Sequence, residues 1–223
     1  MNRLIYKLWL LLCVPVGMSV GMTVGMTVSH AEQIPVNRAP VESLIENRQH
    51  NVVLQQWELS CAAAALASVL RYQHGVPVTE RSVALGMINR PDYLANPSLV
   101  RLRQGFSLLD MKRFTDRLGY TGQGLGQMTY DDLIQRAPVI VPINTNGYPH
   151  FVVFRGAVSS SVLLADPAFG NITLTKNHFL ESWINYRDLG HVGFVVAKHV
   201  NQVDGVSPPG RLRARLSEFP LVR

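Results

Sequence analysis

The chain has 223 residues, 47% of them hydrophobic, and a formal net charge of +6 at pH 7. This length suits one domain with flanking segments, and the hydrophobic content excludes a chain that is disordered because of its composition. The excess of positive charge is mild, and it lacks the basic stripe with interleaved aromatic residues that is typical of nucleic-acid-binding proteins.

Residues 1–31 have the pattern of a signal peptide for export. Arg3 and Lys7 give a basic start, an apolar run follows, and Ser29-His30-Ala31 is a small-x-small cleavage site. Cleavage would leave a periplasmic protein. Retention as an N-terminal membrane anchor is the alternative, because the apolar run is long enough to cross a bilayer.

The rest of the chain divides into an arm, a domain and a tail. Residues 32–50 are polar, contain two prolines and are predicted to form an extended N-terminal arm. Residues 51–198 hold a steady succession of predicted elements and form the predicted domain. Residues 199–223 include the stop Ser207-Pro208-Pro209-Gly210 and read as a basic C-terminal tail.

The first part of the domain is predicted to be helical. Ser60 is the expected N-cap of the first helix and Gly75 its stop, while Ser107 and Asp110 stand at the spacing of a capping box. The predicted helices cover about 61–74, 79–88 and 107–118, with a short one opened by Thr129 and Asp132 and mostly loop at 89–106.

The second part of the domain is predicted to form strands, because short β-branched or aromatic runs alternate with turn residues. These runs are 139–141, 151–154, 162–165, 172–174 and 192–196, and a short helix around 179–184 interrupts them. Helices followed by strands with tight turns predict an α+β fold, with a helical half packed on an antiparallel sheet.

Cys61 is the first candidate for chemistry. Loss of Cys13 with the signal peptide would leave Cys61 alone, so the mature protein could form no internal disulfide. A cysteine attacks carbonyl groups as a thiolate, and the start of a helix is expected to lower its pKa. The alternative is a buried thiol that packs as a small apolar group.

Three further residues complete the candidate site. His150 opens one predicted strand and Asp166 ends the next, so an antiparallel pair would bring them together, and the carboxylate could orient the imidazole. Gln55 lies six positions before Cys61, where its amide could help to bind an oxyanion, and Gln56 is its rival. Each residue alone also suits a surface or turn position, and no pair of histidines has metal-ligand spacing.

Together these residues resemble the bacteriocin-processing cysteine peptidases that cut after double-glycine leaders. The matching segments are Gln55 with Cys61 and the alanine-rich helix, His150-Phe151-Val152-Val153, and Ala165-Asp166-Pro167-Ala168-Phe169-Gly170. The resemblance covers roughly residues 50–197 and implies a papain-like fold. It implies that Cys61 is the nucleophile, His150 the general base, Asp166 its orienting partner and Gln55 the oxyanion donor, with no metal or cofactor.

The same resemblance implies a polypeptide substrate, an exported protein or its leader, and secretion-system components as partners. The family usually shows Asp-Cys-Gly at the nucleophile, whereas this chain has Ser60-Cys61-Ala62. The predicted signal peptide makes it similar to standalone exported members found with functional-amyloid secretion systems. Two alternatives stay open: transfer of the acyl group to another acceptor, and a non-catalytic module that binds an export substrate.

Overall fold

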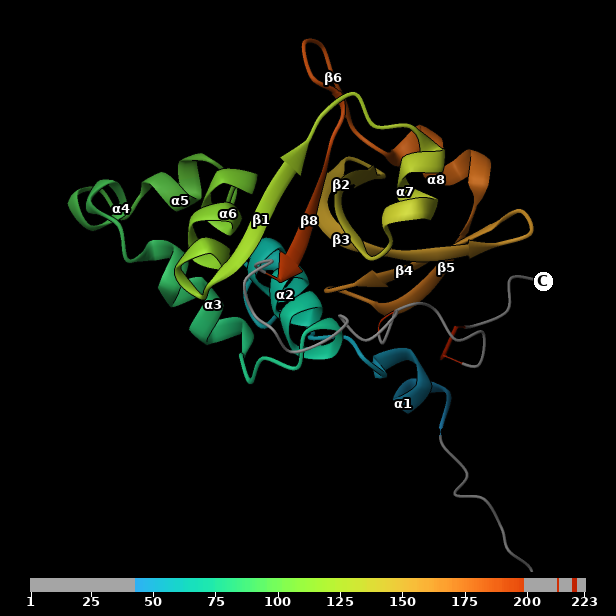
Figure 1. The fold of residues 1–223 in the computed structure, drawn as a ribbon, viewed down its shortest axis with the longest axis horizontal. Helices are drawn as coiled ribbons and strands as arrows, with labels where there is room; N and C mark the ends of the chain where they lie inside the picture. Colours follow the sequence, from blue (N-terminus) through green and yellow to red (C-terminus); the bar gives the residue numbers. More distant parts are fainter. Residues whose placement is uncertain (1–42, 199–211, 213–217, 220–223) are drawn as a thin grey trace, which may run out of the picture. The chain divides into compact units, whose positions relative to one another are not determined.

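The computed structural model describes residues 43–198, 212, 218 and 219 (Figure 1). The predicted signal peptide and most of the predicted arm and tail lie outside these residues. No helix in the described part of the chain has the length and apolar character needed to cross a bilayer. The helices are α1 Leu44–Gln49, α2 Cys61–Ser68, the π-helical turn η1 Val69–Gln73, α3 Glu80–Ile88, α4 Pro91–Ala95, α5 Leu99–Leu102, α6 Leu108–Arg117, α7 Tyr130–Arg136 and α8 Lys176–Ser182.

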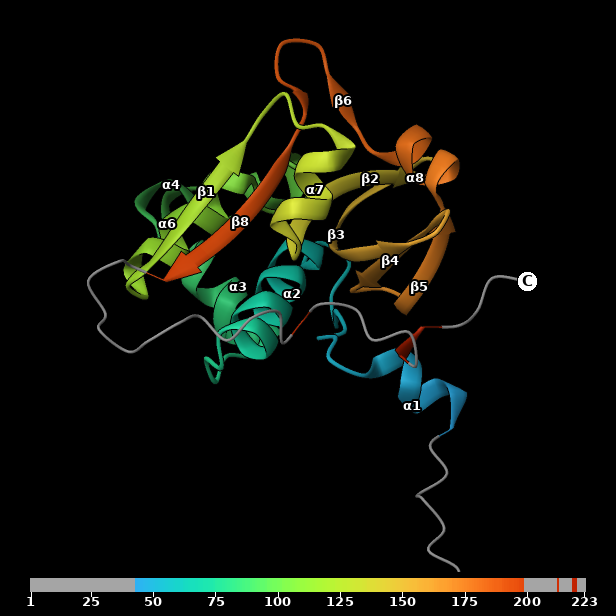
Figure 2. The same cartoon turned by 45° about the vertical axis from the view of Figure 1, so that its right-hand side comes forward.

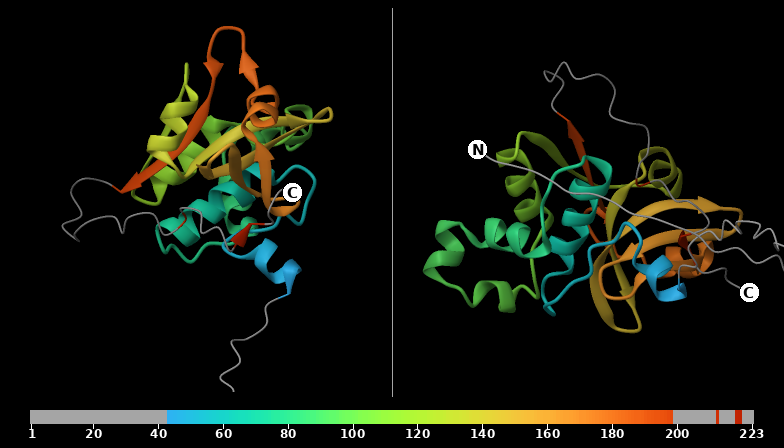
Figure 3. Two further views of the ribbon diagram at one scale, coloured as in Figure 1. Left: turned by 90° about the vertical axis from the view of Figure 1, so that its right-hand side faces the viewer. Right: turned by 90° about the horizontal axis from the view of Figure 1, so that it is seen from below.

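Six strands form one antiparallel sheet in the order β1-β8-β2-β3-β4-β5, and β6 and β7 form a separate hairpin. The hairpin projects from the end of the sheet (Figures 2 and 3). The strands are β1 Tyr120–Leu125, β2 Val139–Thr145, β3 Tyr148–Val158, β4 Ser161–Asp166, β5 Gly170–Thr175, β6 Asn185–Tyr186, β7 Gly190–His191 and β8 Gly193–Lys198. The predicted α+β fold is confirmed.

The sheet separates two apolar cores. Successive residues of a strand point to opposite faces. Accordingly, Val153 of β3 packs in the core that contains α2, α3 and α6, whereas its neighbours Val152 and Phe154 pack in the core that contains Phe179 and Trp183. Helix α2 contacts β3 on the first face, and α7 and α8 contact the sheet on the second. Helix α2, which carries Cys61, is therefore in direct contact with β3, which carries His150.

Helix α2 starts at Cys61, as the sequence predicts, and all its residues are buried. It continues into η1 and ends at Gly75, whose φ of 74° lies in the left-handed region that glycine tolerates. Ser60 occupies the N-cap position, but the prediction that its side chain caps the helix is wrong. Its hydroxyl instead donates to the carboxylate of Glu80 in α3, which tertiary packing brings beside it.

Two regions carry more structure than the sequence predicts. Residues 89–106, expected to be mostly loop, contain α4 and α5, and Pro91 at the start of α4 supplies a helical φ. Strand β1 was not predicted because its two glycines weaken the strand signal. A Cβ atom at Gly122 would lie 2.7 Å from the ring of Phe194, so close packing explains that glycine.

The expected extended arm is wrong for residues 44–49, which form α1. Ser43 and Glu46 make a capping box at its start. The helix packs on β5, where the Asn171 side chain donates hydrogen bonds to the main-chain oxygens of Asn47 and His50. These contacts anchor the segment that leads toward Gln55 to the edge of the sheet.

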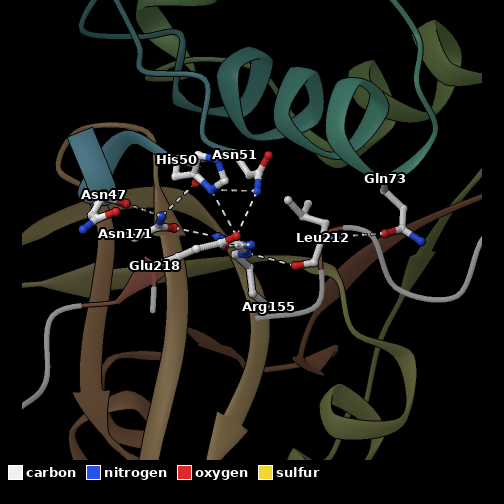
Figure 4. Close-up of polar contacts among 8 residues, drawn as sticks. All are labelled: Asn47, His50, Asn51, Gln73, Arg155, Asn171, Leu212 and Glu218. Atoms are coloured by element: carbon white, nitrogen blue, oxygen red, sulfur yellow. Dashed lines mark hydrogen bonds and ion pairs between the residues drawn. The ribbon is translucent and has the colours of Figure 1, made fainter. Parts of the chain in front are cut away.

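Part of the predicted tail also belongs to the domain (Figure 4). The fully buried guanidinium of Arg155 in β3 donates to the main-chain oxygen of Leu212 and to the Asn171 side chain, both at 2.9 Å. It also forms an ion pair with Glu218, which accepts a further hydrogen bond from Asn51 at 3.0 Å. A buried arginine thus ties β3 to segments near both ends of the described chain.

Candidate active site

His150 and Asp166 lie side by side on adjacent antiparallel strands. His150 belongs to β3 and Asp166 ends β4, and the two strands pair in antiparallel register. The Nε2 atom of His150 lies 2.9 Å from Oδ2 of Asp166, and each side chain is 1% exposed. This contact orients the imidazole. The other ring nitrogen, Nδ1, makes no contact with Asp166.

The turn between β4 and β5 holds the Asp166 carboxylate in place. Its Oδ1 atom accepts hydrogen bonds from the main-chain N–H groups of Ala168, at 2.7 Å, and Phe169, at 3.3 Å. Gly170 closes the turn with a φ of 81°, and a side chain there would collide with the main-chain oxygen of Arg48. Both carboxylate oxygens therefore have fixed partners, as an orienting residue requires.

Cys61 and His150 line the same cavity, which has a volume of about 460 Å³. One wall comes from residues 103–109, before and at the start of α6, and the other from β2, β3 and the segment around the β6–β7 hairpin. Its lining is mostly apolar and includes Phe106, Ile184 and Val192. Such a cavity suits a peptide chain and would shield a reacting carbonyl from water.

The Nδ1 atom of His150 lies 3.1 Å from the main-chain oxygen of Tyr148. Neither ring nitrogen is hydrogen-bonded to the sulfur of Cys61 among the contacts of the described residues. Burial opposes a charge on His150, but the hydrogen bond and charge of Asp166 and the Tyr148 carbonyl outweigh it and raise the pKa of the imidazole. These contacts therefore favour the protonated imidazole more than water does around an isolated histidine.

The pKa of the Cys61 thiol is raised, contrary to the expectation from its place at a helix start. Burial is the main cause, and the negative charge of Asp166 adds to it. Main-chain hydrogen bonds from Phe151 and Ala62 act in the opposite direction without reversing the shift. The environment of Cys61 thus favours the thiol over the thiolate more than water does.

Gln55 lies beside the Asp166 turn rather than in the lining of the cavity. Its main-chain N–H donates to the oxygen of Pro167 at 2.8 Å, and its side-chain Nε2 donates to the main-chain oxygen of Trp57 at 3.3 Å. Its Oε1 atom is buried and has no hydrogen-bond partner. The structure thus brings Gln55 next to the His150–Asp166 pair, and its role at an oxyanion stays a prediction.

Glu80 is a buried residue beside the site that the sequence does not reveal. This residue is 4% exposed and accepts hydrogen bonds from the main-chain N–H of Gln56, at 2.9 Å, and from the hydroxyl of Ser60. In the sequence, an acid after the N-cap Thr79 is typical of a surface helix start. No local signal distinguishes a buried glutamate at this position from an exposed one.

The chain belongs to the peptidase C39 family, whose model matches residues 49–187. This match contains all four candidate residues and confirms the family resemblance drawn from the sequence. The family consists of cysteine peptidases, and the match includes Cys61 and His150, which line one cavity.

Two relatives are probable functional amyloid proteases named FapD. The chain is 41% identical to the one from Pseudomonas fluorescens over 145 residues, which cover 64% of this chain and 61% of the relative. It is 37% identical to the one from Pseudomonas aeruginosa PAO1 over 187 residues, or 82% of this chain and 78% of the relative. The match thus spans less than two thirds of the first relative.

The fold is also similar to a solved double glycine motif protease from an AMS/PCAT transporter, crystallised in complex with a leader peptide. The identity is 22% and the TM-score 0.52, and the match covers 66% of this chain and 91% of the solved one. This likeness supports the papain-like architecture inferred for the described domain.

Proposed function

We propose that the protein is a cysteine endopeptidase that cleaves an exported polypeptide, or its leader, with Cys61, His150 and Asp166. The observation that carries the proposal is the cavity that Cys61 and His150 share, with Asp166 bonded to the far side of the imidazole. Membership of the peptidase C39 family supports the same chemistry.

The first step is removal of the thiol proton. A main-chain oxygen can only accept a hydrogen bond, so the Tyr148 contact requires a proton on Nδ1 of His150. When the ring is neutral with its proton on Nε2 toward Asp166, Nδ1 has a free lone pair. It accepts the thiol proton as sulfur attacks the substrate carbonyl.

The second step is binding of the oxyanion that this attack creates. A primary amide has two N–H donors, and one donor of Gln55 is used by Trp57. We expect the other donor to bind the oxyanion, together with the main-chain N–H of Cys61. The imidazolium then protonates the leaving amine, and water releases the acyl group from sulfur.

The names of the relatives support the proposed substrate, and the sequence supports the proposed location. The proteins named FapD and the double glycine motif protease support an exported chain, cut after a pair of small residues, within a functional-amyloid secretion system. The signal-peptide pattern of residues 1–31 supports action in the periplasm after export.

The test uses the full chain and a library of synthetic peptides in which Gly-Gly precedes the expected cut, with products identified by mass spectrometry. The wild type should cleave after Gly-Gly, and Cys61→Ala should abolish cleavage while circular dichroism and thermal unfolding stay unchanged. Cleavage that continues in Cys61→Ala would refute the assignment of the nucleophile.

A non-catalytic module that binds an export substrate is the second candidate, because burial raises the pKa of the Cys61 thiol. It predicts that peptides bind to the wild type and to Cys61→Ala with equal affinity and that neither protein cuts them. Isothermal titration of the same peptide library distinguishes this candidate from the endopeptidase.

A further inference from the structure

The loop between Gln55 and Cys61 carries both groups that would bind the oxyanion, yet it contains no regular secondary structure. Residues 56–60 make a turn in which the main-chain N–H of Ser60 donates to the oxygen of Trp57 at 3.3 Å. Trp57 and Glu58 are exposed, so packing does not hold the tip of this loop. Contacts at its two ends therefore contribute to its shape.

Glu80, the first residue of α3, makes those contacts. Its Oε1 atom accepts from the main-chain N–H of Gln56 at one end of the turn and from the hydroxyl of Ser60 at the other. Within the described residues Glu80 forms no ion pair, so neutral donors hold a carboxylate that is 4% exposed. Burial of a carboxylate is costly without such partners, and an apolar residue would pack at lower cost.

The clamped turn presents the Trp57 carbonyl to the Gln55 amide. The Trp57 oxygen lies 2.7 Å from the Ser60 hydroxyl and accepts from Nε2 of Gln55 at 3.3 Å. A chain of contacts therefore runs from Glu80 through Ser60 and Trp57 to the amide of Gln55. Ser60 also precedes Cys61 directly, and its main-chain oxygen accepts from Ala64 in the first turn of α2.

We propose that Glu80 is a positioning residue of the active site: it clamps both ends of the 56–60 turn and so aims the Gln55 amide and the Cys61 N–H at one point. The inference rests on the proposed peptidase function. Helix α3 contributes no residue to the cavity lining. Through Glu80 it would nevertheless control where the two oxyanion donors lie.

The test compares Glu80→Met, which keeps the size but removes the acceptor, with Glu80→Gln, which keeps an acceptor oxygen. With the Gly-Gly peptides, Glu80→Met should lower kcat by about 10²-fold and change KM little, since misplaced oxyanion donors act on the transition state. Glu80→Gln should recover most of this loss. Glu58→Gln, an exposed carboxylate of the same loop, is the matched control and should keep the wild-type kcat.

Hydrogen–deuterium exchange gives a readout that does not need catalysis. The main-chain N–H of Gln56 should exchange faster in Glu80→Met than in wild type, with the core of α2 unchanged. If Glu80→Met does not fold, Ser60→Ala removes one of the two contacts and should lower kcat by about tenfold.

Two results would overturn the role of Glu80: a kcat within about twofold of wild type in Glu80→Met, or equal losses in Glu80→Gln and Glu80→Met. Inactivity of the wild type toward every peptide would instead contradict the proposed function. The Gln56 exchange rate would still decide in that case whether Glu80 holds the loop.

Discussion

The Nδ1 atom of His150 lies 3.1 Å from the main-chain oxygen of Tyr148, while its Nε2 lies 2.9 Å from Asp166. Both partners accept hydrogen bonds, so together they select the doubly protonated ring. Loss of the Nδ1 proton breaks the Tyr148 contact and frees a lone pair for the Cys61 thiol. The protonation state of His150 therefore decides whether Nδ1 donates to Tyr148 or can accept a proton.

The pH dependence of cleavage should report this switch. His150 must be neutral to accept the thiol proton, so kcat/KM should fall as the pH decreases through the pKa of His150. Because Asp166 and Tyr148 raise this pKa, the midpoint of the acid limb should lie above the ordinary histidine value of 6.5. An acid limb at or below that value would show that these contacts do not raise the pKa of His150.

Asp166→Asn should shift the same limb. The change removes the charge and the carboxylate hydrogen bond that raise the pKa of His150, so the residual activity should fall at a lower pH than in wild type. The rate should also drop by about 10²- to 10⁴-fold, because the tautomer is no longer fixed. An unchanged limb in a folded variant would show that Asp166 does not control the imidazole.

Alkylation of Cys61 should be slow in the free protein. Burial raises the pKa of the thiol, so at pH 7 its thiolate fraction, and hence its rate with iodoacetamide, should be lower than that of free cysteine. The rate should increase as the pH rises above 9.0, the ordinary value. Peptide mapping of the Cys61 peptide measures the rate without interference from Cys13. Labelling faster than free cysteine below pH 7 is the opposing outcome.

The contacts of Arg155 predict a large effect on stability. Glu218→Ala leaves the buried guanidinium without its carboxylate and should lower the free energy of unfolding by about 3–5 kcal/mol. The exposed Glu58→Ala serves as the control and should change it by less than about 0.5 kcal/mol. Urea denaturation of the three proteins gives the comparison. Equal stability of Glu218→Ala and wild type would show that the contact between Glu218 and Arg155 does not stabilise the domain.

Gly170 offers a test of the turn that holds Asp166. Gly170→Ala and Gly119→Ala both place a side chain at a φ near 80°, at a cost of about 1–2 kcal/mol each. Only the first also meets a main-chain oxygen, that of Arg48, whereas Gly119 has open space. Gly170→Ala should therefore be the less stable protein and should lose activity, and similar behaviour of the two would contradict the packing argument.

The sequence predicted features that depend on neighbouring residues. The capping boxes of Ser107 with Asp110 and of Thr129 with Asp132 start α6 and α7 as expected, because both partners lie within one helical turn. The short β-branched and aromatic runs likewise predicted the strands that carry His150 and Asp166.

The features that the sequence did not predict depend on distant partners. Ser60 was assigned as a cap because Glu80, twenty positions away, is invisible to a local pattern. The pKa of Cys61 was expected to fall because the start of its helix was known and its burial was not. Glu218 was placed in a tail, since its partner Arg155 lies 63 positions before it.

In the proposed mechanism, Cys61 reacts with a substrate carbonyl because His150 takes its proton. An affinity label tests it most directly: a peptide chloromethyl ketone ending in Gly-Gly, incubated with the full chain and followed by peptide mapping. We expect one adduct on Cys61, none in Cys61→Ala, and labelling slowed at least about 10²-fold in His150→Ala. Equal labelling rates in wild type and His150→Ala would contradict it.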